Sequence, residues 1–171
     1  MRHLLIATTG VALLVVATTA SASSADTSAL TVPAAGPKSV SASWTGQVPV
    51  GLSTTFTDCN GNVATASHKI HVTVPRGAYN VVKAKLSFVV DSAPPLNGDL
   101  IELRDPSGAT VGTDQQKSEM VVEVSNPVAG DYTALVCALL PDGPAHDYTA
   151  SVTISTKCKA VSPCPSPKRK P

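Results

Sequence analysis

Three aspartates in the middle of the chain are the candidates for a metal site. Asp91, Asp99 and Asp105 fall at or beside the proline- and glycine-containing stretches that separate apolar segments. Calcium takes six or more oxygen ligands, several of them carboxylates, and Asn97 would add to the set. Aspartates at turns more commonly hydrogen-bond the backbone near them. The residues therefore indicate either a calcium site or turn capping, and no other cofactor.

Histidine, serine and acidic residues suggest further chemistry, but their spacing does not support it. His68 and His71 are three apart on an expected strand, so they point to opposite faces and cannot chelate one ion; we expect His71 to face solvent. His146 and Asp147 stand in a serine-rich chain, yet no Gly-x-Ser-x-Gly nucleophile elbow accompanies them. We therefore expect no catalytic residues and no enzymatic activity.

Four cysteines, Cys59, Cys137, Cys158 and Cys164, favour a disulfide framework. An even number in an exported chain indicates two disulfides, and zinc would want a Cys-x-x-Cys pair, which is absent. We favour a long Cys59–Cys137 link and a short Cys158–Cys164 link. The other two pairings stay open, because Cys158 closely follows the last expected strand and is also placed to reach Cys59 or Cys137.

The first 22 residues have the form of an export signal. A short basic start precedes an apolar run, and Ala20-Ser21-Ala22 gives the small-x-small pattern that signal peptidase cleaves, between Ala22 and Ser23. The apolar run is shorter than the roughly 20 residues that a membrane-spanning helix needs. We expect a secreted, extracellular protein with no membrane span after cleavage.

Residues 23–171 are enough for one domain with a substantial core. Arg2 is the only charged side chain in the signal, so twelve basic and twelve acidic residues remain. This neutral balance gives no electrostatic basis for binding nucleic acid. Composition divides the chain into a flexible leader (23–38), a folded domain (39–156) and a proline-rich basic tail (157–171), in which Lys168-Arg169-Lys170 would contact an anionic cell-surface polymer or simply solubilise the end.

Apolar and polar residues alternate throughout the folded domain, as on strands with one buried face. The alternating segments are 39–45, 69–74, 82–90, 101–104, 119–124, 132–136 and 148–155. Prolines paired with glycine or asparagine separate them, and these pairs are typical of turns. The pattern predicts an all-β protein, an antiparallel β-sandwich or jelly roll of seven to eight strands.

Several of these segments together resemble a known family. Ile70-His71-Val72-Thr73-Val74-Pro75, Asp99-Leu100 through Gly108, Asn126 through Tyr132, and Tyr148 through Val152 resemble motifs of pre-peptidase C-terminal domains and, less closely, of proprotein-convertase P-domains. The resemblance covers about half of the mature chain. It implies a jelly roll that accompanies secreted peptidases and helps folding, anchoring or substrate contact, in some members with calcium. This sequence differs in having no peptidase domain and no second aspartate after Asp99-Leu100.

The aromatic residues give little support for a sugar site. Trp44, Phe88, Tyr132 and Tyr148 share the parity of the apolar faces and are expected in the core, which leaves Phe56 and Tyr79 as candidates for exposed rings. The sequence therefore predicts a secreted, non-catalytic accessory or interaction domain. Its partner would be an extracellular protein or a cell-surface polymer, and the alternative is a calcium-supported binding module for carbohydrate or an extracellular protein.

Overall fold

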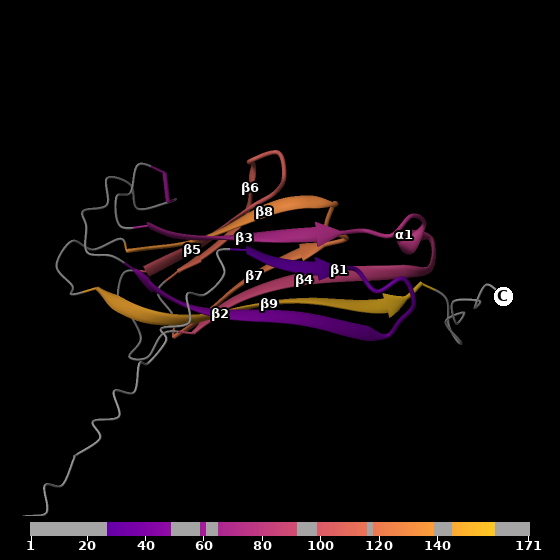
Figure 1. Cartoon of the computed structure of the whole chain (residues 1–171), viewed down its shortest axis with the longest axis horizontal. Helices are drawn as coiled ribbons and strands as arrows, with labels where there is room; N and C mark the ends of the chain where they lie inside the picture. The colour runs from indigo at the N-terminus through magenta and orange to yellow at the C-terminus, as the bar shows by residue number, and fades with distance from the viewer. Residues whose placement is uncertain are drawn as a thin grey trace, which may run out of the picture.

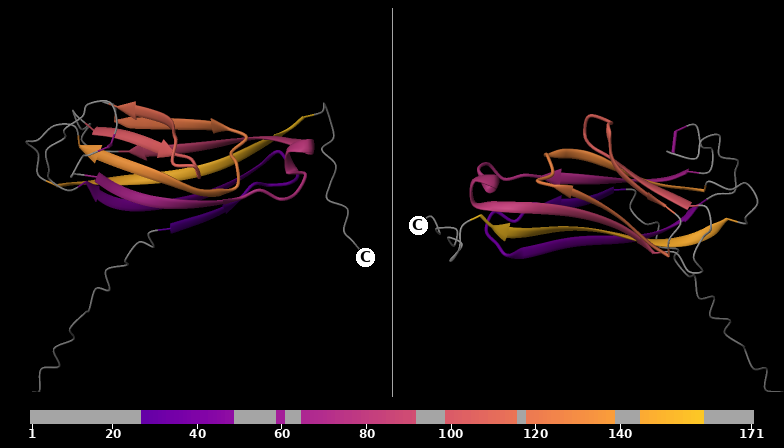
Figure 2. Two further views of the ribbon diagram at one scale, coloured as in Figure 1. Left: turned by 90° about the horizontal axis from the view of Figure 1, so that it is seen from above. Right: turned by 180° about the vertical axis from the view of Figure 1, so that it is seen from behind.

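The computed structural model describes residues 27–48, 59–60, 65–91, 99–115, 118–138 and 145–159. Within these ranges the chain forms nine strands and one short helix, α1 (Ala78–Val81). The strands make two sheets that pack face to face as a β-sandwich (Figure 1). Two further views show the same two layers from above and from behind (Figure 2).

The larger sheet has five strands, and all but one of its neighbouring pairs are antiparallel. β1 runs parallel to β3, whereas β3–β8, β8–β5 and β5–β6 are antiparallel. In spatial order the strands are β1 (Thr27–Thr31), β3 (Thr65–Thr73), β8 (Gly130–Ala138), β5 (Asp99–Arg104) and β6 (Thr110–Gln115).

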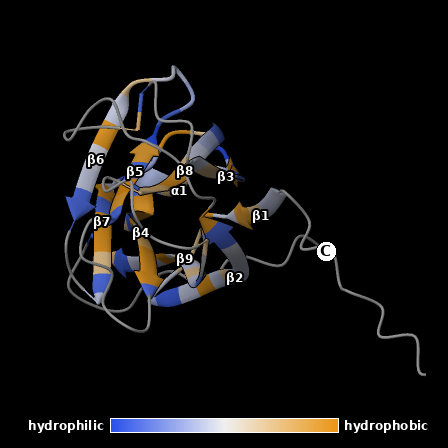
Figure 3. Cartoon of the chain, turned by 90° about the vertical axis from the view of Figure 1, so that its left-hand side faces the viewer, coloured by the Kyte–Doolittle hydropathy of each residue, from blue (hydrophilic) through white to orange (hydrophobic). Residues whose placement is uncertain are grey.

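The smaller sheet has four strands and is wholly antiparallel. In spatial order they are β2 (Lys38–Val48), β9 (His146–Cys158), β4 (Val82–Asp91) and β7 (Glu119–Ser125). The last strand of the chain, β9, therefore lies between β2 and β4. The end-on view shows β1 and β2 at one side of the sandwich and β6 and β7 at the other (Figure 3).

The core lies between the two sheets, and the alternation in the sequence predicts which residues form it. Trp44, Ile70, Phe88, Tyr132 and Ile154 are all buried there, as their parity indicates. Burying side chains of this size is the main stabilising term for the fold. The predicted all-β sandwich is confirmed, with nine strands in the described ranges where the sequence predicts seven to eight.

Two expectations about the ends of the domain need correction. Residues 23–38 are predicted to be a flexible leader, but Thr27–Thr31 form β1 and Leu30 is buried in the core. The final strand reaches Cys158, two residues beyond the predicted end of the domain. Residues 27–31 form a strand because they pair with β3 in parallel. Their short, weakly apolar sequence does not indicate this pairing.

No helix in the described ranges is both long and apolar enough to cross a membrane.

Candidate functional site

The Asp-Pro-Ser-Gly sequence at residues 105–108 forms a turn around one carboxylate. Asp105 Oδ1 accepts hydrogen bonds from the backbone N–H of Ser107 at 2.9 Å, from the Ser107 hydroxyl at 2.6 Å and from the N–H of Ala109 at 3.1 Å. Gly108 follows with a φ of 85°, which favours glycine. Bonds chiefly from Ser107 hold the pKa of Asp105 below its ordinary value. Here the aspartate caps the turn between β5 and β6.

The Asn-Pro-Val-Ala-Gly-Asp-Tyr sequence at residues 126–132 contains a second turn, and this turn contacts the first. Asn126 Oδ1 accepts the N–H of Ala84 at 3.1 Å, and the hydroxyl of Tyr132 accepts the N–H of Val128 at 2.9 Å. A Cβ on Gly130 would lie 2.7 Å from the ring of Pro106, so only glycine fits between the two turns. These two turns, which belong to two of the four segments that carry the family resemblance, therefore act in folding.

Tyr79 is tied to the second turn as well. Its hydroxyl donates to the carbonyl of Pro127, and burial, with a smaller effect of Tyr132, raises the pKa of Tyr79 to about 12. Tyr79 is therefore a half-buried structural residue and not the exposed ring that the sequence suggested. Trp44, Phe88, Tyr132 and Tyr148 are buried as predicted, and Phe56 lies outside the described residues.

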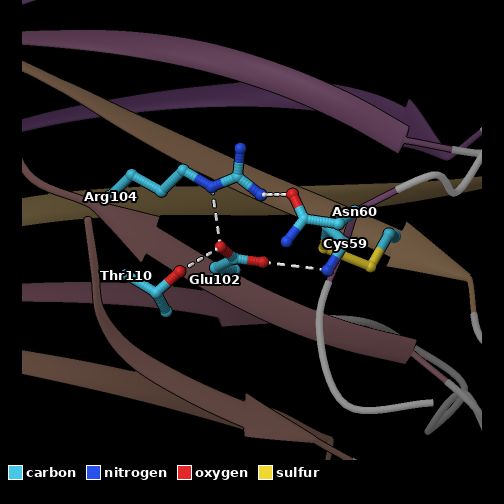
Figure 4. Close-up of a disulfide and its surroundings, with 6 residues drawn as sticks. Cys59, Asn60, Glu102, Arg104 and Thr110 are labelled. Carbon is cyan, nitrogen blue, oxygen red and sulfur yellow. Dashed lines mark hydrogen bonds and ion pairs between the residues drawn. A yellow bond between two sulfur atoms is a disulfide. The ribbon is translucent and has the colours of Figure 1, made fainter. Parts of the chain in front are cut away.

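A buried carboxylate, Glu102, is the most unusual group in the described structure (Figure 4). Its side chain is fully buried on the outer side of the five-stranded sheet. Glu102 Oε1 accepts from Arg104 Nε at 2.7 Å and from the Thr110 hydroxyl at 2.6 Å, and Oε2 accepts from the Cys59 N–H at 2.8 Å. Burying a charge is costly unless it is paired and hydrogen-bonded, and Glu102 is both.

The ionised form of Glu102 is the favoured one. Burial raises its pKa, but the hydrogen bonds from Arg104, Thr110 and the Cys59 backbone, with the Arg104 charge, outweigh that effect and hold the pKa below its ordinary value. Arg104 Nη2 also donates to Asn60 Oδ1 at 2.7 Å. The carboxylate thus joins strands β5 and β6 to residues 59–60, a segment from elsewhere in the chain.

A disulfide completes this attachment. Cys59 and Cys137 are bonded, with 5.9 Å between their Cα atoms and a sequence separation of 78. With Leu100 and Leu135 they form a small apolar cluster on the outer side of the five-stranded sheet. The predicted long link is present. Cys158 is not a free thiol, while Cys164 lies outside the described residues, so the short link stays a prediction.

The three aspartates of the suggested calcium site are not brought together. Asp91 ends β4 in one sheet, whereas Asp99 begins β5 in the other. Asp105 follows the far end of β5, roughly 20 Å along the strand from Asp99. In the described ranges no group of three or more His, Cys, Asp or Glu side chains is placed to hold a metal ion. Asn97 lies outside those ranges.

The two candidate histidines have separate roles, as their spacing predicts. His68 is buried, stacks on Trp44 with ring centroids 3.9 Å apart, and is hydrogen-bonded to the Ser28 hydroxyl at 2.9 Å. His71 is exposed, and its Nδ1 lies 2.6 Å from Asp131 Oδ1 across the β3–β8 pair. His68 fills the core and His71 makes a surface contact.

The outer face of the four-stranded sheet carries mainly small hydroxyl side chains, and we name it the Ser/Thr face. All its members are exposed or half-buried: Ser39, Ser41, Ser43 and Thr45 on β2, Thr149, Ser151, Thr153 and Ser155 on β9, and Ser87 on β4. Charged side chains stand to one side of it, where Lys85 Nζ pairs with Glu123 Oε1 at 2.6 Å. Alternation in β2 and β9 predicts this face.

Comparison with known proteins assigns the chain to no family. No protein-family model and no curated protein matches the chain. Among solved structures, the pre-peptidase C-terminal domain of a collagenase from Bacillus anthracis matches at a TM-score of 0.44 and 12% identity, over 74% of this chain and 93% of that one. A periplasmic inhibitor of g-type lysozyme from Aeromonas hydrophila matches at 0.34 and 12%, over 77% and 99%. The first belongs to the family that the sequence motifs resemble.

Proposed function

We propose that this chain is an exported, non-catalytic interaction domain that binds a partner protein outside the cell through its Ser/Thr face. The observation that carries the proposal is the composition of that face. It spans three neighbouring strands, and its rows on β2 and β9 have no charged residue between Ser39 and Thr45 or between Thr149 and Ser155.

Such a face suits a protein contact for two physical reasons. Each hydroxyl both donates and accepts hydrogen bonds, so the face can match a partner's polar groups in either sense. Serine and threonine also lose less side-chain freedom than lysine or glutamate when a partner covers them. Ser41 and Thr153 already share a 2.9 Å hydrogen bond between their hydroxyls, which orders part of the face before any partner arrives.

The residues best suited to catalysis have structural partners, which favours a non-catalytic role. Glu102 uses both carboxylate oxygens to hold Cys59, Arg104 and Thr110. Asp105 closes its own turn, and His68 stacks against Trp44 in the core. These side chains therefore stabilise the fold through contacts within the chain.

The Cys59–Cys137 disulfide supports export of the chain. Cytosolic thiol systems keep cysteines reduced, so disulfides that stabilise a fold are found mainly outside that compartment. The signal-like residues 1–22 agree with this assignment.

A binding experiment with two matched variants tests the proposal. Residues 23–171, with disulfides intact, are immobilised and exposed to culture medium of the producing organism, and retained proteins are identified. Thr153→Lys adds a bulky charge to the Ser/Thr face, and Thr133→Lys does the same on the five-stranded sheet. Both threonines are half-buried and lie on strands with a neighbour on each side. We expect one protein to be retained by wild type and Thr133→Lys and lost with Thr153→Lys.

Three outcomes would contradict the proposal. Equal retention by both variants would remove the Ser/Thr face from the contact, and loss only with Thr133→Lys would move the contact to the other sheet. Retention of the chain by insoluble cell-wall polymer alone, lost when calcium is chelated, would replace the protein partner with the calcium-supported binding module.

A further inference from the structure

The strand β2 is an edge strand of unusual length and regularity. All eleven positions from Lys38 to Val48 pair with β9 without a shift of register. Among the described strands β2 has a neighbour on that side only, and it forms the outer margin of the four-stranded sheet (Figures 1 and 3). Alternate backbone groups along β2 therefore point away from the sheet.

The opposite margin of the same sheet is protected. Strand β7 carries exposed Glu119 and Glu123, and Asp114 Oδ2 of the neighbouring β6 accepts the N–H of Val121 at 3.0 Å. Natural sheets commonly protect their edges with charges, prolines, bulges or short strands, which discourage another strand from pairing. From Ser39 to Val48 the sequence of β2 has no charge and no proline, and its register has no bulge.

The sequence of β2 is also complementary to itself when it is reversed. Antiparallel pairing about Ser43 places Ser41 opposite Thr45 on the outer side, so hydroxyls meet hydroxyls. On the inner side Ala42 comes opposite Trp44, a small residue beside a large one, and Val40 comes opposite Gly46. Each contact then occurs twice, as a two-fold symmetric interface requires.

The inner side of β2 supplies apolar surface for such a contact. Val40 and Ala42 pack against the core but remain half-buried at the margin of the sandwich. The ring of Tyr148 occupies the space that a side chain on Gly46 would fill, so a neighbouring Val40 would meet an aromatic surface there. Covering these groups removes apolar area from water.

We propose that two copies of this chain pair through their β2 strands, antiparallel and centred on Ser43. The two four-stranded sheets would then form one continuous eight-stranded sheet. A two-fold axis perpendicular to the sheet keeps both Ser/Thr faces on the same side, so the dimer presents a binding surface of twice the width. This assembly is independent of which partner the Ser/Thr face binds.

Cysteine cross-linking tests both the pairing and its register. At the centre of the interface Ser43 of each copy faces Ser43 of the other, within the Cα separation of about 4.4–6.8 Å that a disulfide spans. Ser39 would be displaced from its own counterpart by roughly 26 Å along the strand. Mild oxidation of Ser43→Cys should therefore give a covalent dimer, and Ser39→Cys, an exposed serine on the same strand and face, should not.

Sedimentation of the chain without added cysteines gives a second readout. The weight-average mass of disulfide-intact wild type should rise toward that of a dimer with concentration. Ser43→Lys places two like charges opposite each other and should weaken the dimer by about fivefold or more. Ser151→Lys, on the neighbouring β9, should not, because its counterparts would lie roughly 14 Å apart and be screened by salt.

A wild-type chain that stays monomeric at every concentration overturns the proposal, whatever else its β2 edge binds. So does efficient cross-linking of Ser39→Cys in place of Ser43→Cys, since that requires another register. Dimerisation that is unchanged in Ser43→Lys also overturns it, because the interface must then lie elsewhere.

Discussion

The two outer faces of the sandwich are built in opposite ways. On the five-stranded sheet, a disulfide, a buried carboxylate and a half-buried arginine fasten residues 59–60 over β5 and β8. On the four-stranded sheet, rows of serine and threonine face outward with Ser41–Thr153 as one cross-strand contact. The first face is a site of stabilisation, whereas the polar contacts described on the second are exposed. Substitutions on the two faces should therefore differ sharply in their cost.

The disulfide should have the largest effect. Replacing Cys59 and Cys137 by serine opens a loop closed across 78 residues. The chain-entropy model gives a loss of about 4–5 kcal/mol in the free energy of unfolding. Denaturant unfolding of the double variant measures it. A loss below about 1 kcal/mol would show that the fastened face does not need its covalent link.

Trp44→Ala should give the next largest loss of stability, although Trp44 lies on the inner side of the sheet that carries the Ser/Thr face. The indole packs against His68 and Phe88, with ring centroids 3.9 and 6.0 Å away. Removing a buried ring of this size costs about 3–5 kcal/mol. Thermal unfolding measures the change. Stability equal to wild type would mean that the packing of Trp44 does not contribute to the stability of the four-stranded sheet.

Glu102→Gln should cost less than either, about 2–3 kcal/mol, because the amide keeps the shape but loses the charged contacts with Arg104. The pH dependence gives a sharper test. Since the pKa of Glu102 is lowered by folding, its contribution is present above the ordinary value of 4.5 and is lost as pH falls through the folded value. Wild type should lose stability on acidification more steeply than Glu102→Gln. Equal slopes would show that the carboxylate is not held ionised.

Thr153→Ala on the Ser/Thr face should have the smallest effect, with a free energy of unfolding within about 0.5 kcal/mol of wild type. Among the described residues its hydroxyl bonds Ser41, and that bond is exposed. Urea unfolding beside Glu102→Gln compares the two faces directly. A loss as large as that of Glu102→Gln would remove the distinction between them.

The sequence predicts the inner side of the sandwich well and its fastened outer side poorly. Ile70 and Val72, and Phe88 and Val90, alternate with polar neighbours, and the buried side follows from that pattern. The same pattern assigns Glu102 to water, because it stands between Ile101 and Leu103. Glu102 is buried instead, since a segment from more than 40 residues earlier in the chain bonds to it.

One available signal pointed to this burial. Val136 faces the core, so its neighbour Cys137 must face outward, and a disulfide from there to Cys59 has to lay residue 59 on the outer side of the sheet. Leu100 pairs with Cys137 in the register, and Glu102 is the next residue on that side of β5. The sequence of β1 contains no comparable indication of a strand. Its five residues are weakly apolar, and they are held by parallel pairing with β3.

The position of β9 between β2 and β4 has a consequence for the order of events during synthesis of the chain. A chain that emerges from its amino end delivers β2, β4 and β7 while the strand that joins β2 to β4 is still missing. Neither neighbour of β9 can complete its ladder until residues 146–158 arrive. The sheet is thus closed from its middle by the last strand, and such long-range pairing slows folding. Nascent chains stalled before His146 should remain sensitive to proteases, and release of the final strand should confer resistance in a single step.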